Sequence, residues 1–80
     1  MYKVVFGNSY IIVSSKELEE ELKKLINFVI YGEKIDIREA LKTIHYLKKY
    51  KSNNRSAVLL VKLAEKKILE ILKKSDEPLW

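Results

Sequence analysis

Residues 56–74 carry the sequence SAVLLVKLAEKKILEILKK, the longest run of the chain with apolar side chains at helical spacing. The pattern predicts a helix of about five turns. At about 100° per residue, one stripe collects Ala57, Leu60, Val61, Ala64, Ile68, Ile71 and Leu72, and the opposite side collects Lys62, Lys66, Glu70 and Lys73. Val58, Leu59 and Leu63 lie outside the stripe, so the first half of the helix is apolar nearly all round. Such a helix must be covered on more than one side, at the centre of a core or at a subunit interface.

The chain of 80 residues is short enough for a single domain, residues 1–80, with a modest core. It contains no cysteine, so neither disulfides nor thiolate metal sites stabilise it. Oligomerisation is then the remaining common source of stability for so small a domain. No apolar run approaches the roughly 18 residues of a membrane span, and no signal peptide is visible. We therefore expect a cytoplasmic protein that does not contact membranes.

The charge of the chain is unevenly distributed. It has 16 basic and 11 acidic residues, a net charge of +5. Residues 1–31 are neutral, whereas residues 42–67 contain eight basic residues and one acidic residue. Such a basic segment is typical of proteins that bind nucleic acid or another anion. The alternative is a general coating of lysine, because 14 Lys, 9 Ile and no Gln resemble a hyperthermophile composition.

The N-terminal residues 2–13 predict a β-hairpin. Tyr2–Phe6 and Tyr10–Val13 are rich in β-branched and aromatic residues, and Gly7-Asn8 between them suits a type II′ turn. The register then places Tyr2, Val4, Phe6, Ile11 and Val13 on one face and Val5, Tyr10 and Ile12 on the other. One layer of helices covers only one of these faces, and an isolated two-stranded ribbon is marginal. We therefore expect a homodimer through the hairpin, the helix at 56–74 or both, and two hairpins could join edge to edge, pack face to face or exchange strands.

Two more helices are expected between the hairpin and the last helix. The first spans 15–31, with a capping box at Ser14–Glu17, a stop at Gly32, and a buried stripe of Leu18, Leu22, Leu25, Ile26 and Val29. The second spans 37–51, begins after Asp36, and buries Ile37, Ala40, Leu41, Ile44 and Leu47. Asn54 or Ser56 caps the helix at 56–74, and a short tail covers 75–80. The predicted fold class is α+β: an N-terminal β-hairpin followed by three α-helices.

The end of the second helix and the following turn form the best candidate site. Lysines and an arginine bracket the polar turn Ser52-Asn53-Asn54, and two tyrosines lie one helical turn apart beside them. Lys and Arg neutralise phosphates, and Tyr stacks on bases or reaches the backbone. The predicted nucleic-acid-binding residues are Lys42, Tyr46, Lys48, Lys49, Tyr50, Lys51 and Arg55. The alternative is a solvated helix end whose lysines complement the helix dipole.

A helix-turn-helix motif is not expected. A recognition helix presents polar side chains from its first turns, but here those turns are Ala57-Val58-Leu59-Leu60-Val61. If the chain binds DNA, the second helix and the turn are the expected contacts, mainly with phosphates.

Arg38 and His45, separated by six residues, lie on the same flank of the second helix. This spacing resembles the active-site motif of HEPN ribonucleases, which are all-helical domains that cleave RNA. The resemblance covers two residues and implies an RNase role for them. The chain departs from that family in its β-hairpin, its short length and Glu39 after the arginine. We therefore predict that the chain is not an enzyme and has no cofactor or bound metal.

Two functions remain open. The first is a small basic accessory or regulatory protein that binds nucleic acid, most plausibly DNA, through phosphates. The second is a non-enzymatic protein-interaction module: an inhibitor, an antitoxin-like protein or a small complex subunit, of viral or plasmid origin. The second is suggested by the apolar hairpin, by Leu59 and Leu63, and by the tail Leu79-Trp80 as a docking segment.

Overall fold

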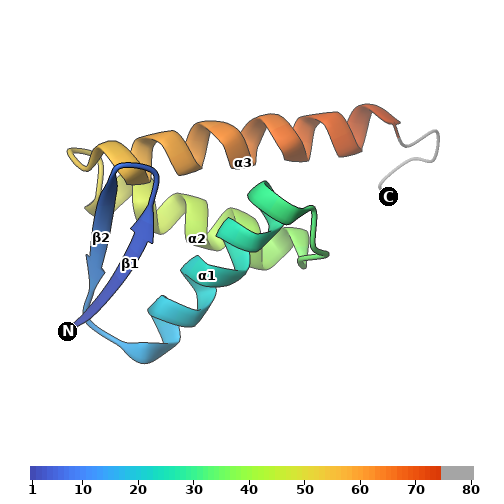
Figure 1. Ribbon diagram of the computed structural model, residues 1–80. Helices are drawn as coiled ribbons and strands as arrows, with labels where there is room; N and C mark the ends of the chain where they lie inside the picture. The colour runs from blue at the N-terminus through green and yellow to red at the C-terminus, as the bar shows by residue number, and fades with distance from the viewer. Residues whose placement is uncertain (75–80) are drawn as a thin grey trace.

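The computed structural model describes residues 1–74, so the expectations for the tail 75–80 lie outside the described residues. The elements follow the order β1 (Tyr2–Phe6), β2 (Ser9–Val13), α1 (Lys16–Tyr31), α2 (Ile37–Tyr50) and α3 (Arg55–Lys74) (Figure 1). The predicted α+β class, a hairpin followed by three helices, is confirmed. Each helix starts or ends within one residue of the predicted boundary.

The hairpin has the predicted register. The antiparallel strands pair Val4 with Ile11 and Val5 with Tyr10. Gly7 has a φ of 66°, whereas Asn8 does not take a positive φ, which is the sign pattern of a type II′ turn. The register therefore directs one set of alternate side chains towards the helices and leaves the other set on the outside.

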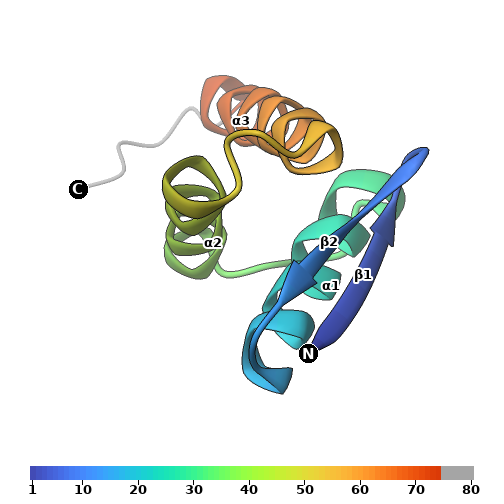
Figure 2. The ribbon, with the colours of Figure 1, turned by 90° about the vertical axis from the view of Figure 1, so that its left-hand side faces the viewer.

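The core lies between the inner face of the hairpin and the three helices. Viewed along α3, the helices α3 and α2 and the pair formed by the hairpin and α1 occupy three corners around it (Figure 2). The largest fully buried side chains come from β2 and from all three helices: Ile11, Val13, Leu22, Leu25, Leu47 and Leu60. α3 contacts α1, α2 and β2, and α1 contacts both strands and the other two helices, so these two helices join the layers.

Several burial predictions are wrong, and helix length and phase explain them. Ile71 is 43% exposed because α3 extends past the ends of the shorter helices (Figure 1). Leu41 is 51% exposed because it lies at the edge of α2 rather than on its core face. Tyr2 pairs with Val13, as the predicted register requires, but is exposed at the end of β1. Phe28, which was not predicted, is buried.

The helix caps correct one prediction and resolve another. The cap of α1 is Ser15, not Ser14: its hydroxyl accepts a hydrogen bond from the backbone N–H of Leu18, so Glu17 is not at the third helical position. Gly32 ends α1 in the left-handed conformation with a φ of 69°, as glycine readily does. Of the two candidates for the cap of α3, Asn54 has this role, because its Oδ1 accepts from the N–H of Ala57 at 3.0 Å.

Two polar side chains also tie the start of α3 to the hairpin. Asn54 Nδ2 donates to the carbonyl oxygen of Tyr10 at 2.8 Å. The buried hydroxyl of Ser56 donates to the carbonyl oxygen of Phe6. Asn54 thus caps a helix with one side-chain atom and holds a strand edge with the other, across 44 residues of chain.

We predict that Asn54→Ala lowers the free energy of unfolding by about 1–2 kcal/mol, because it removes both the cap and the bond to the strand. The matched control is Asn53→Ala, since Asn53 is exposed in the same turn, and its effect should stay within about 0.5 kcal/mol. Urea unfolding followed by circular dichroism measures both. Equal effects at the two positions would mean that the link between turn and hairpin contributes no stability.

Candidate nucleic-acid interface

The predicted residues on α2 do not share one face. Lys42 and Lys49 are exposed and, seven residues apart, lie on the same outer ridge of the helix. Tyr46 is half-buried and packs against the core, whereas Tyr50 is exposed, with its ring centroid 5.3 Å from that of Tyr46. Lys49 Nζ lies 5.4 Å from the Tyr50 ring centroid, within range of a cation–π contact. Tyr46 is therefore mainly a packing residue that supports Tyr50.

The lysines at the end of α2 face α3. Lys48 Nζ forms an ion pair and hydrogen bond with Glu65 Oε2 of α3 at 2.7 Å. Lys51 is half-buried at the C-terminal cap of α2, and with Lys48 and Lys62 it lines a hollow between the two helices. Part of the positive charge predicted for this region is therefore neutralised by Glu65.

The set of predicted binding residues did not include a row of basic residues along α3, apart from Arg55 at its start. Arg55, Lys62, Lys66 and Lys73 are all exposed, and their spacing places them within about 40° of one another around the helix. Glu65 and Glu70 fall on either side of this row and not within it. Among residues 1–74, ion pairs join only Lys23 with Glu19 and Lys48 with Glu65, so no member of the row is paired there. The signal was present in the spacing of seven, four and seven residues.

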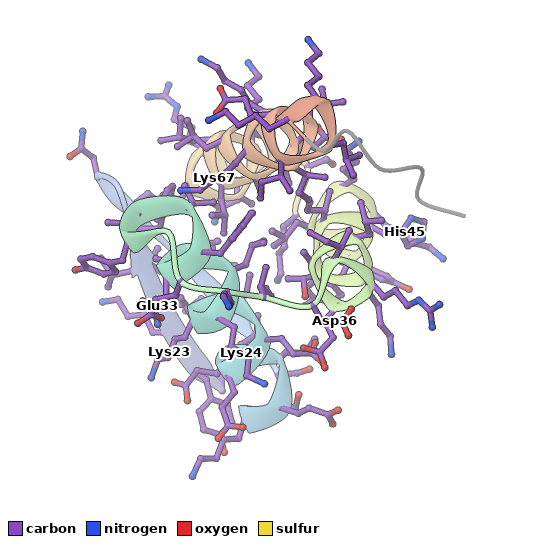
Figure 3. The ribbon with its side chains drawn as sticks, turned by 90° about the vertical axis from the view of Figure 1, so that its right-hand side faces the viewer. Lys23, Lys24, Glu33, Asp36, His45 and Lys67 are labelled. Atoms are coloured by element: carbon purple, nitrogen blue, oxygen red, sulfur yellow. The ribbon has the colours of Figure 1, made fainter. Side chains whose placement is uncertain are left out.

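The remaining lysines lie elsewhere. Lys67 turns towards α1, where its Nζ lies 5.5 Å from the Phe28 ring centroid (Figure 3). Lys23 and Lys24 project from α1, on the side of the molecule away from the outer side of α3 (Figure 3). Lys3 Nζ lies 4.5 Å from the Tyr10 ring centroid on the outer face of the hairpin. The excess of basic over acidic residues thus lies on α2, α3 and their connecting turn, although lysines are also exposed on α1 and the hairpin.

α2 and α3 form an antiparallel pair and not a helix-turn-helix. Lys48 near the end of α2 contacts Glu65 in the middle of α3, and Ile37 at the start of α2 lines a groove with Leu72 near the end of α3. The two helices run side by side (Figure 1), unlike the crossing of about 90–120° of a helix-turn-helix. Any contact with nucleic acid is therefore made by the outer side of the pair.

Arg38 and His45 are exposed on α2, and the His45 side chain points away from the body of the molecule (Figure 3). Residues 1–74 contain no group of three or more His, Cys, Asp or Glu side chains placed to hold a metal ion. Within the same residues, no helix is both long enough and apolar enough to cross a membrane. The absence of enzymatic activity remains a prediction.

Comparisons of the chain with protein-family models, with curated proteins and with solved structures found no match. The support for any function therefore comes from the geometry of the chain itself.

We predict that Glu65→Gln changes the free energy of unfolding by less than about 1 kcal/mol, because the pair with Lys48 is solvent-exposed. Glu70→Gln is the matched control, since Glu70 is an exposed glutamate of the same helix without an ion pair among residues 1–74. Urea unfolding compares the two variants. A loss above about 2 kcal/mol at Glu65 alone would show that the pair holds α2 against α3.

Proposed function

We propose that this protein binds nucleic acid through phosphate contacts made by the outer side of α3 and the turn before it. The observation that carries the proposal is the row Arg55, Lys62, Lys66 and Lys73, which is exposed and forms no ion pair among the described residues. Lys and Arg in such a row neutralise phosphates and release counterions, which drives binding without reading sequence.

The length of the row fits a nucleic-acid backbone. Arg55 and Lys73 are 18 residues apart, about 27 Å along the helix and about the rise of eight base pairs. Three of the four residues are lysines, and lysine contacts phosphate as a point charge without the bidentate geometry that reads guanine. Binding with weak sequence preference and strong salt dependence follows.

The predicted α2 residues have a secondary role in this proposal. Lys51 adjoins the row at the turn, since it lines the same hollow as Lys62. Lys42 and Lys49 continue the basic surface onto the outer ridge of α2, where the exposed Tyr50 ring offers a face on which a base stacks.

The test is a pair of variants with equal loss of charge. In the first, Arg55, Lys62, Lys66 and Lys73 are changed to Ala; in the control, Lys16, Lys23, Lys24 and Lys34, all exposed, are changed to Ala. Fluorescence anisotropy with labelled duplex DNA, duplex RNA and single-stranded DNA at several salt concentrations gives the affinity. We expect the first variant to bind much more weakly. The slope of its log K against log salt concentration should be smaller in magnitude by about 3–4 units, at roughly 0.9 per phosphate contact.

Two results contradict the proposal. If wild type binds none of the three probes at low salt, the chain is not a nucleic-acid-binding protein. If both variants weaken binding equally, net charge and not the α3 row determines the affinity, and the site is wrong.

We also infer that two copies associate through the hairpin. On its outer face Val5 is 66% exposed, Tyr10 is exposed and Ile12 is half-buried. In a two-residue hairpin the alternate residues of β1, here Lys3 and Val5, turn their backbone groups away from β2, leaving an edge to which a second strand pairs. Burial of an apolar outer face and pairing of an open edge both favour self-association.

We predict that sedimentation velocity gives a particle of twice 9.4 kDa at low micromolar concentration and that Val5→Lys shifts it to the monomer. The control is Ile30→Lys, which places the same charge at a residue of α1 that is 54% exposed. A monomeric wild type, or dissociation caused equally by both substitutions, would contradict association through the hairpin.

A further inference from the structure

A groove follows the line where α2 and α3 meet, on the side turned away from α1 and the hairpin. Its first part, about 280 Å³ in volume, lies between the end of α2 and the start of α3, and includes Leu47, Val58 and Val61. Its second part, about 480 Å³, includes Leu41, Ile68 and Leu69. Glu65 lines both parts, so the two hollows adjoin at this residue, where its ion pair with Lys48 joins α2 and α3.

The walls of this groove are more apolar than folding requires. Leu41 is 51% exposed and Leu69 is 56% exposed, so neither contributes much to the core. Val58, also exposed, lies 11 residues before Leu69, which is three helical turns, and continues the same edge of α3. An amphipathic helix normally carries polar residues at such edge positions. An aligned set of exposed apolar residues is typical of a binding surface.

The first part of the groove has a basic border, and the second part is lined by apolar residues and Glu65. Lys48, Lys51 and Lys62 line the first part, where Glu65 is the acidic group and is already paired with Lys48. The basic row of α3 runs along the neighbouring side of the same helix. An apolar floor with a basic border complements a segment that is apolar on one side and acidic on its flanks.

We propose that the groove between α2 and α3 binds an acidic amphipathic helix of a protein partner. Val58 and Leu72 are 14 residues apart, so the groove is about 21 Å long and matches a helix of about four turns. Two antiparallel helices side by side present a straight channel into which the ridge of a third helix packs. The anchors of the partner are apolar residues spaced at i, i+3 or i+4, and i+7, as in other helix-in-groove complexes.

Other occupants fit the groove less well. A second copy presents the same basic border, so two such faces repel each other. A nucleic-acid backbone pairs with the lysines but leaves Leu41, Leu69 and Val58 uncovered. The proposal concerns a different ligand from the nucleic acid of the α3 row and does not depend on it.

The probe is a synthetic helix of about 16 residues with leucines at i, i+4, i+7 and i+11 and glutamates on its flanks. A second peptide has the same composition but its leucines are distributed around the helix. Amide chemical shifts of the full chain locate each peptide, and fluorescence anisotropy measures its affinity. We expect the amphipathic peptide to bind at concentrations below about 100 µM, to shift the amides around Leu41, Val58 and Leu69, and to bind more tightly than the second peptide by about tenfold.

Substitutions then separate the groove from the general surface. Leu69→Gln and Leu41→Gln should each raise the Kd of the amphipathic peptide by about tenfold. Ile30→Gln, at a similarly exposed residue of α1, should leave it unchanged. Retained unfolding temperatures in these three exposed-site variants confirm that the fold is intact.

Four results overturn the proposal. The amphipathic peptide does not bind, or the two peptides bind equally, which indicates simple charge attraction. Duplex DNA shifts the same groove amides more strongly than the peptide does, which assigns the groove to nucleic acid. Leu69→Gln dissociates a dimer of the wild type, which assigns the groove to a second copy.

The two functions can fail separately. If the α3 row variant loses DNA binding but still binds the peptide at Leu69, the proposal for the groove stands.

Discussion

The hydrogen bonds from Asn54 and Ser56 to the hairpin carbonyls determine how α3 lies on the rest of the chain. Asn54 bonds to Tyr10 and Ser56 to Phe6, so the first turn of α3 is attached to both strands. A helix attached at its first turn has a fixed rotation about its axis. With that rotation, Leu60, Ala64 and Ile68 face the core, and the residues half a turn away must face solvent. The position of the basic row on the surface therefore follows from these two polar contacts together with the buried apolar stripe of α3.

The same attachment explains why charge is segregated on the molecule. α1 and the hairpin cover one side of α3, and α2 lies along another. Lys67, which faces α1, extends over the Phe28 ring, and Lys48, which faces α3, pairs with Glu65. Among the described residues only Lys23 and Lys48 form ion pairs, so the lysines on the uncovered side of α3 and on the outer ridge of α2 keep their charge, as do Lys16 and Lys24 of α1. A charge count along the sequence identifies the basic region, but packing determines which of its charges are available.

The sequence predicted the elements of the fold well because local rules govern them. Alternation and the Gly7-Asn8 turn determined the hairpin register, and Gly32 and Asp36 marked helix ends through their own backbone chemistry. The errors concern positions where burial depends on another element. Ile71 satisfies the helical period but lies beyond the ends of the helices that pack on α3. Leu41 lies at the edge of the α2–α3 pair, and the sequence does not determine the distance between these two helices. For the candidate site, the sequence identified the residue types and the region, but not that Lys48 would pair with a glutamate 17 residues away.

In a chain of this size, apolar residues that remain on the surface are expected to have a physical reason to be there. Its exposed apolar residues include Val5 and Tyr10 on the hairpin and Leu41, Val58 and Leu69 along the groove, besides others such as Ile30, Leu59 and Leu63. Figure 2 shows the hairpin on the opposite side of the molecule from α2, so a dimer formed through the hairpins would leave the α2–α3 groove of each copy accessible. Such a dimer presents each binding surface twice, and the distance between the copies then controls whether one duplex contacts both rows. If it does, the second contact is intramolecular and adds affinity without any new side chain. On the proposed function, weak phosphate contacts from a single helix would then suffice once the hairpin joins two chains.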